Sequence, residues 1–111
     1  MTLPGIGRGP HEHARQTDCF CFLGPSNFKV YLWDRRKDSP TCGAKHVFFA
    51  GVDSPCMVVI PPGVVHAYKN VGTENGIVYN APNRLYAGEG KKHPVDEIRH
   101  EDIMLLRVST V

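Results

Sequence analysis

The sequence predicts an all-β fold, a small antiparallel barrel or sandwich. Roughly seven short apolar or alternating segments recur at spacings of about 8–12 residues, which is typical of such folds. Turns rich in glycine, proline and asparagine separate these segments. No stretch shows the 3.6-residue apolar period of an amphipathic helix, and no apolar run approaches the ~20 residues of a membrane span.

Composition narrows the class of protein. A chain of 111 residues with 41% hydrophobic and 22% charged residues fits one globular domain with a modest core, here residues 1–111. The net charge of +2 and the scattered basic residues argue against a nucleic-acid partner. The N-terminus lacks the apolar segment of a secretory signal, and the four cysteines form no CxxC motif. We therefore expect a cytoplasmic protein without a membrane partner.

The first half of the chain contains three expected strands. Residues 1–9 are rich in glycine and proline and are expected to form an extended lead-in. His11–Arg15 alternates in polarity, so that His11 and His13 would share one face of a strand. The β-prone segments Asp18–Leu23 and Phe28–Trp33 follow, with a Gly-Pro-Ser-Asn hairpin turn between them.

The second half continues the same pattern. A polar, turn-rich connection over 34–43 precedes the next strands, and residues 82–102 form a loop-rich C-terminal segment. The apolar run Ile103–Val108 is compatible with a short strand or a helical turn. The strands expected between these segments are Lys45–Ala50, Cys56–Ile60, Val64–Val71 and Ile77–Ala81.

A turn in the middle of the chain, Pro61-Pro62-Gly63, fixes the position of the histidine that follows it. Pro61-Pro62-Gly63 ends an apolar strand, because proline cannot continue a sheet ladder and glycine tolerates the turn. The chain then restarts as a strand that carries His66 and ends near Asn70. The resulting spacing, PxGxxHxxxN, resembles the second motif of the cupins.

A first cupin motif is present upstream in the expected order. His11, Glu12 and His13 are followed by Asp18 and Gly24, close to the cupin pattern HxHx(3,4)E…G, with aspartate where glutamate is usual. The two motifs together imply a cupin barrel, that is, a double-stranded β-helix or jelly roll.

Three further stretches resemble one branch of the cupins, the dTDP-4-dehydrorhamnose 3,5-epimerases and the related dTDP-sugar 3,4-ketoisomerases. Residues 8–11 match the family's RGxH, residues 34–43 match D-x-R-x-x-SPT-x-G, and Ile60–Tyr68 matches IPxGxxHGF. The resemblance implies an isomerase or epimerase that moves a proton of a dTDP-linked 4-keto-6-deoxy sugar without a metal or other cofactor.

The resemblance also implies roles for particular residues. His11 would be the catalytic base and Tyr79 the acid, with His13 the second histidine that the ketoisomerases carry in RGxHxH. Three residues would bind the substrate: Arg8 at the nucleotide phosphates, His66 at the wall of the site, and Tyr86. The epimerases' lysine downstream of the base is missing. Candidates for the carboxylate that partners the base are Glu97, Glu101 and Asp102.

Two other functions remain open from the residues themselves. Three histidines and one carboxylate suit a divalent transition metal with open coordination positions. The ligands of that metal-dependent cupin would be His11, His13, Asp18 and His66. A non-catalytic barrel that binds a sugar or nucleotide is the third hypothesis. In each case we expect a homodimer, since family members pair through their sheets.

Overall fold

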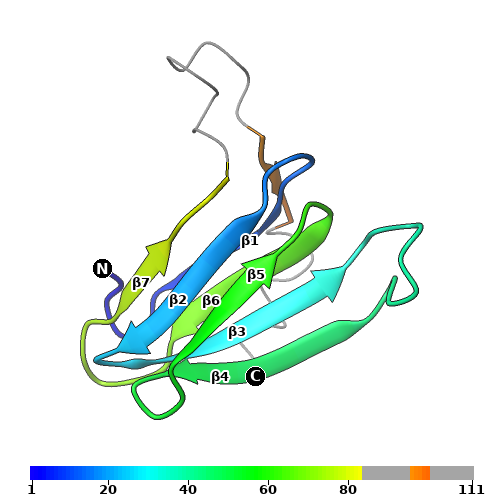
Figure 1. The fold of residues 1–111 in the computed structure, drawn as a ribbon. Coiled ribbons are helices and arrows are strands. Elements are labelled where there is room, and N and C mark those ends of the chain that lie inside the picture. Colours follow the sequence, from blue (N-terminus) through cyan, green and yellow to red (C-terminus); the bar gives the residue numbers. More distant parts are fainter. Residues whose placement is uncertain (84–95, 101–111) are drawn as a thin grey trace, which may run out of the picture.

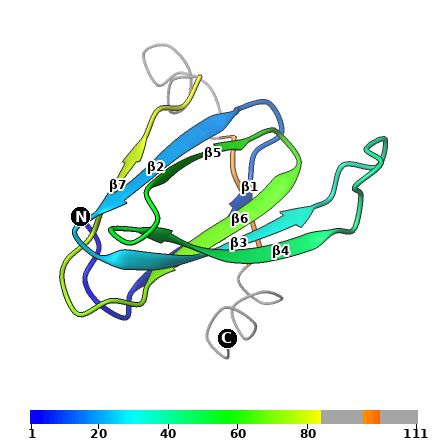
Figure 2. The same ribbon diagram turned by 60° about the horizontal axis from the view of Figure 1, so that its bottom comes forward.

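The computed structural model describes residues 1–83 and 96–100, which fold into two antiparallel sheets that face each other (Figures 1 and 2). One sheet has the strand order β4-β3-β6-β1-β8 and the other has the order β5-β2-β7. The strands are β1 (Gly7–Glu12), β2 (Asp18–Gly24), β3 (Asn27–Asp34), β4 (Lys45–Gly51), β5 (Cys56–Ile60), β6 (Val64–Asn70), β7 (Ile77–Asn80) and β8 (Ile98–Arg99). The predicted all-β jelly-roll architecture is confirmed.

The core lies between the two sheets and follows from the alternation of apolar residues. On β3, Phe28 and Val30 point inward and are almost completely buried, as period-two alternation requires. On β2, Phe20 and Phe22 do the same from the opposite sheet. These side chains fill the space between the two sheets, and Phe20 also contacts the ring of His66.

The structure corrects three details of the sequence interpretation. The turn at 24–27 is not a hairpin, because β2 and β3 belong to different sheets and the turn carries the chain across the barrel. The lead-in is shorter than expected, since β1 already begins at Gly7 to pair with β6. The C-terminal segment contains β8, which pairs with the end of β1. Tyr86, Glu101, Asp102 and Ile103–Val108 lie outside the described residues.

Other features bear on the class of protein. All four cysteines are unpaired, and Cys42 is exposed. Across residues 1–83 and 96–100, no helix is long and apolar enough to cross a membrane.

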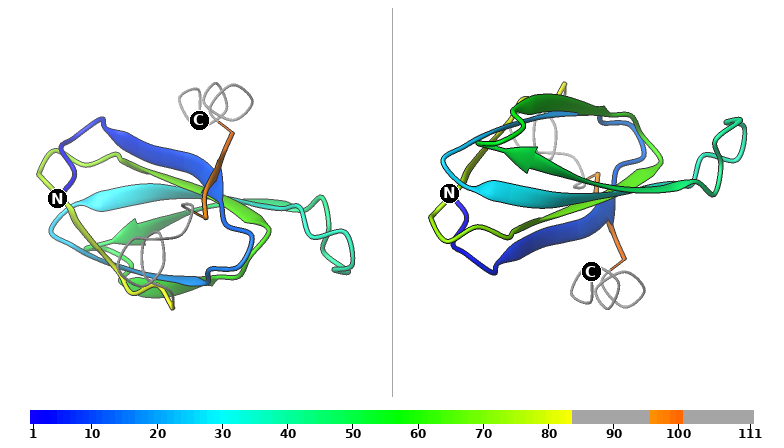
Figure 3. Two further views of the ribbon diagram at one scale, coloured as in Figure 1. Left: turned by 90° about the horizontal axis from the view of Figure 1, so that it is seen from above. Right: turned by 90° about the horizontal axis from the view of Figure 1, so that it is seen from below.

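The family-like segment 34–43 is a projecting arm held by one carboxylate (Figure 3). The Asp34 carboxylate accepts hydrogen bonds from the Arg36 guanidinium (3.0 and 2.9 Å) and from the hydroxyls of Ser39 (3.1 Å) and Thr41. These bonds hold the pKa of Asp34 well below its usual range, the Arg36 side chain being the largest cause. The SPTxG motif is thus explained locally by the need to close this arm around Asp34.

The asparagine of the second cupin motif has a structural role. Asn70 is fully buried, and its side-chain oxygen accepts hydrogen bonds from Ser26 Oγ (2.7 Å) and the Gly72 amide (3.0 Å). Its amide nitrogen donates to the carbonyls of Thr2 (2.9 Å) and Glu74 (2.8 Å). One side chain therefore ties the N-terminus to two turns at the end of the barrel away from the histidines.

Candidate functional site

An irregularity in β1 brings two candidate residues to the same face. In the pairing of β1 with β6, Arg8 lies opposite Tyr68 and His11 lies opposite His66, so that three steps on β1 match two steps on β6. In a regular strand, residues three apart point to opposite faces, and the extra residue of the bulge restores the same face. Gly9 lies in this bulge with a φ of +86°, a conformation that favours glycine.

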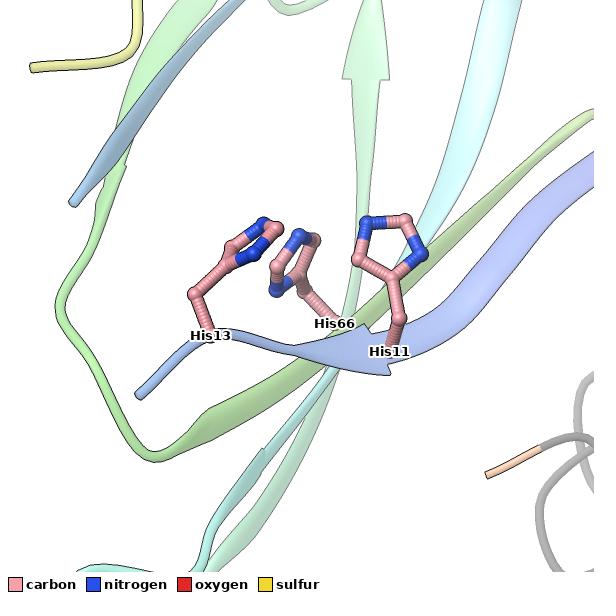
Figure 4. A group of neighbouring side chains, drawn as sticks. All are labelled: His11, His13 and His66. Atoms are coloured by element: carbon pink, nitrogen blue, oxygen red, sulfur yellow. The ribbon is translucent and has the colours of Figure 1, made fainter. Parts of the chain in front are cut away.

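Three imidazoles gather at this end of the barrel (Figure 4). His11 on β1 and His66 on β6 have ring centroids 4.4 Å apart, and His13, just past the end of β1, is 5.4 and 5.5 Å from them. One ring nitrogen from each histidine lies within 4.8 Å of the others. The structure thus brings together the three histidines that the two cupin motifs predicted.

His13 is held at both ring nitrogens by acceptors. Its Nε2 lies 2.9 Å from Asp18 Oδ2, and its Nδ1 contacts the backbone carbonyl of Asp96. Because neither acceptor can supply a hydrogen, both nitrogens must donate, and the ring is then the doubly protonated imidazolium. In agreement, the hydrogen bond to Asp18 raises the pKa of His13.

Asp18 is the buried counter-charge of this cluster. Burial opposes its ionisation, but hydrogen bonds from His13 and Gln16 and the nearby His66 ring outweigh burial and hold the pKa of Asp18 well below its usual range. The Gln16 amide donates to Asp18 Oδ1 at 2.6 Å, and His66 Nε2 lies 3.3 Å from Oδ2. The lowered pKa of Asp18 and the raised pKa of His13 thus both favour an ion pair between the two side chains.

Asp96 supports the cluster from the C-terminal segment, and sequence reasoning missed it. Its carboxylate accepts hydrogen bonds from the backbone amides of Ala14 (2.6 Å), Arg15 (2.7 Å) and Gln16 (2.9 Å). These bonds order the turn between β1 and β2 that carries His13. No local pattern marks this role, because the partners are 80 to 82 residues apart along the chain.

His11 differs from His13 in its electrostatic surroundings. Burial, followed by repulsion from His66 and His13, lowers the pKa of His11 from 6.5 to about 4. Its ring is therefore neutral at pH 7 and can accept a proton. Glu97, one of the predicted carboxylate candidates, has Oε1 3.9 Å from His11 Nδ1, too far for a hydrogen bond but close enough to stabilise an imidazolium.

His11 faces a cavity of about 280 Å³ in the mouth of the barrel. The side chains that line it include a cation, an aromatic wall, a tyrosine and an amide, namely Arg8, Phe20, Tyr68 and Asn80. Arg8 and His11, which were predicted to belong to one site, therefore line the same cavity.

Two other predicted residues do not reach this cavity. Tyr79 lies opposite Cys21 in the β2–β7 register, on the outer face of the sheet, and is 65% exposed. This position does not support the assignment of Tyr79 as the acid, which stays a prediction. His66 packs behind His11 and is only 2% exposed, so it supports the base and does not line the cavity. Tyr86 lies outside the described residues.

The residues of the alternative metal site do not fit a metal as they are arranged. A ligating imidazole must present a free lone pair, whereas both nitrogens of His13 donate hydrogen bonds. Asp18 is committed to the same ring. Among the described residues, His66 Nε2 is the one buried side-chain nitrogen or oxygen without a hydrogen-bond partner. Coordination by all four residues would require the His13–Asp18 contact to break.

Comparisons with known proteins agree with the fold. No protein-family model matches the chain. The spore coat polysaccharide biosynthesis protein SpsL of Bacillus subtilis is 38% identical over 79 residues, which cover 70% of this chain and 52% of that protein. The probable low-salt glycan biosynthesis epimerase Agl13 of Haloferax volcanii is 36% identical over 88 residues, which cover 78% of this chain and 55% of that protein.

Two solved structures of sugar isomerases and epimerases share the fold of this chain. A dTDP sugar isomerase from Desulfovibrio desulfuricans matches with a TM-score of 0.77 and 23% identity, over 89% of this chain and 59% of that one. A dTDP-4-dehydrorhamnose 3,5-epimerase from Bacillus anthracis matches with a TM-score of 0.69 and 20% identity, over 88% of this chain and 53% of that one. The chain has the jelly-roll fold of these solved structures, and its sequence is similar to those of two proteins of polysaccharide and glycan biosynthesis. It spans about half the length of the curated relatives it matches.

Proposed function

We propose that this protein is an isomerase or epimerase of a dTDP-linked 4-keto-6-deoxy sugar. The observation that carries the proposal is the presence of Arg8 and a neutral His11 in one cavity. A guanidinium suits a diphosphate because its planar fork donates two parallel hydrogen bonds. A neutral imidazole suits the removal of a proton from a carbon next to a ketone.

In the proposed mechanism, His11 takes the proton and the electrons of the C–H bond pass to the ketone oxygen, which becomes an enolate. Glu97 stabilises the His11 imidazolium that forms, since its carboxylate is 3.9 Å from Nδ1. Burial, followed by repulsion from His66 and His13, keeps His11 neutral before the reaction, whereas the charge of Asp18 acts in the opposite direction. Protonation of the same carbon on the opposite face completes epimerisation, and protonation of the adjacent carbon completes ketoisomerisation.

The proposal requires no metal or other cofactor. The chemistry of the donor set supports this part, since His13 has no nitrogen left for a ligand bond. The proton transfers are carried by side chains, and the enolate is stabilised by hydrogen-bond donors instead of by a Lewis acid.

A homodimer in the cytoplasm is also part of the proposal. The outer face of the β5-β2-β7 sheet carries large apolar side chains, each more than half exposed: Leu23, Met57, Val59, Ile77 and Tyr79. Exposed apolar patches of this kind commonly mark interfaces, and a two-fold axis would cover the same patch on both copies. Sedimentation of the wild type and of Val59→Glu over a range of concentrations tests this, and a wild-type monomer throughout would contradict it.

The experiment that tests the function measures exchange of the substrate's C3 proton with deuterated solvent. We expect exchange with a dTDP-4-keto-6-deoxyhexose in the wild type, none in His11→Ala, and similar dTDP binding in both. Arg8→Ala should instead weaken dTDP binding. Tight dTDP binding without any exchange by the wild type would favour the non-catalytic binding barrel.

A further inference from the structure

We propose that Tyr68 is a further catalytic residue, whose hydroxyl donates a hydrogen bond to the enolate oxygen formed when His11 removes the substrate proton. This inference rests on the proposed function and assigns the donor that it needs. The lysine that the epimerases carry downstream of the base, which could stabilise an enolate, is missing from this chain. Tyr79 faces away from the cavity. Tyr68 stands where the family pattern IPxGxxHGF has phenylalanine, so its hydroxyl is an addition to that pattern.

The position of Tyr68 on β6 points its ring into the site. It follows His66 by two residues, so both side chains lie on the inner face of the strand, about 7 Å apart along it. Its partner on β1 is Arg8, and the partner of His66 is His11. The two pairs thus form neighbouring rungs on the same inner face, and Arg8, His11 and Tyr68 line one cavity.

Packing fixes the ring of Tyr68, which lines the cavity together with Thr2, the hydrogen-bond partner of its hydroxyl. The ring makes edge contacts with Phe20, Phe22 and Phe28 at centroid distances of 5.8, 5.6 and 5.7 Å. Burial raises the pKa of Tyr68, and the charge of Arg8 and a hydrogen bond with Thr2 offset this only in part. The hydroxyl is therefore protonated at neutral pH and can donate.

The chemistry balances without another reactant. His11 gains the proton from carbon, the C–H electron pair forms the carbon–carbon double bond, and the ketone π electrons move to oxygen. Tyr68 keeps its proton and shares it with this oxygen in a charge-assisted hydrogen bond, which is stronger than the bond to the neutral ketone. The His11 imidazolium then gives the proton to the former carbonyl carbon, and the proton of the neighbouring hydroxyl passes to the former ketone oxygen, which completes a ketoisomerisation.

The test compares Tyr68→Phe with Tyr79→Phe. Tyr68→Phe restores the residue of the family pattern and removes a single oxygen atom, so the apolar packing of the ring is retained. Loss of one oxyanion donor should slow C3 proton exchange at saturating substrate about 10²-fold, with the dTDP dissociation constant unchanged within about twofold. Tyr79→Phe, which changes a hydroxyl on the outer face, should exchange at the wild-type rate.

The outcomes separate this inference from the function on which it rests. Wild-type exchange that persists unchanged in Tyr68→Phe would overturn the role of Tyr68 alone. A loss of exchange in Tyr79→Phe with none in Tyr68→Phe would return the role to Tyr79. No exchange by the wild type with dTDP-4-keto-6-deoxyhexoses would overturn both proposals. Weaker dTDP binding with unchanged exchange in Tyr68→Phe would show that Tyr68 binds the nucleotide and does not act on the enolate.

Discussion

Arg8 and His11 face the same cavity although three positions separate them on one strand. The bulge at Gly9 makes this possible, since it inserts one residue between the partner of Tyr68 and the partner of His66. This geometry explains why arginine, glycine and histidine occur at the spacing RGxH in this chain. A cation and a base that must meet one ligand are placed on adjacent rungs, and the glycine supplies the backbone conformation between them.

The first prediction concerns this bulge. A Cβ on Gly9 would lie 2.6 Å from the backbone carbonyl oxygen of His66, and the φ of +86° is already unfavourable for alanine. We expect Gly9→Ala to destabilise the fold by more than the ~1–2 kcal/mol of a left-handed residue alone and to abolish proton exchange. Gly5→Ala is the matched control, because Gly5 has a φ of +78° and no atom within 4 Å of the added Cβ. Equal urea midpoints for the two variants would contradict the assigned clash.

The second prediction concerns the buried ion pair. Asp18→Asn removes the negative charge that holds His13 as an imidazolium, at a carboxylate whose side chain is 1% exposed. Breaking one partner of a buried pair typically costs about 3–5 kcal/mol, and the pKa of His13 should fall. Urea unfolding and an NMR titration of the His13 ring measure the two effects. Asp53→Asn, at an exposed aspartate bonded to Asn27, should change stability by less than about 0.5 kcal/mol.

The third prediction is a pH dependence of stability that originates at His11. Its folded pKa of about 4 lies below the unfolded value of 6.5, so the unfolded chain takes up the proton first. The stability is full above pH 6.5 and is lost as the pH falls toward 4, by on the order of 3 kcal/mol. His11→Gln should remove this slope from a series of urea midpoints between pH 7 and 4.

The other members of the cluster act in different pH windows. The raised pKa of His13 gives stability that is full below pH 6.5 and is lost at higher pH, and the lowered pKa of Asp18 matters only below its ordinary value of 3.8. Neither adds to a loss between pH 6.5 and 4. A slope in this window that persists in His11→Gln would therefore show that another group causes it.

Much of the fold could be predicted because its signals are local. Alternation is consistent with the burial of Phe28 and Val30 on one face of their strand, and the Pro-Pro-Gly turn correctly predicts that His66 lies on the strand that follows it. The arrangement of three histidines followed from the two motifs once a barrel was assumed. These features depend on residues that lie within a few positions of each other.

The errors come from long-range pairing. Ile77–Asn80 carries apolar or aromatic residues on both faces, so alternation alone cannot say that Val78 faces inward and Tyr79 outward. The register of β7 with β2 determines which of these side chains faces inward. Tyr68 was overlooked as a polar group because its position in the family pattern belongs to a phenylalanine. The support that Asp96 gives to His13 joins two ends of the chain and has no local signal.

The last prediction is the metal content of the wild type. Because both nitrogens of His13 donate hydrogen bonds, to Asp18 and to the Asp96 carbonyl, we expect protein purified without chelator or nickel affinity resin to contain well below one equivalent of metal per chain. Elemental analysis measures this directly. Near one equivalent of iron, manganese or zinc, lost in His13→Ala, would show that the His13–Asp18 contact opens to admit a metal and would support the metal-dependent cupin. Metal-free wild type that still exchanges the C3 proton would place the whole reaction on side chains, with His11 as the base.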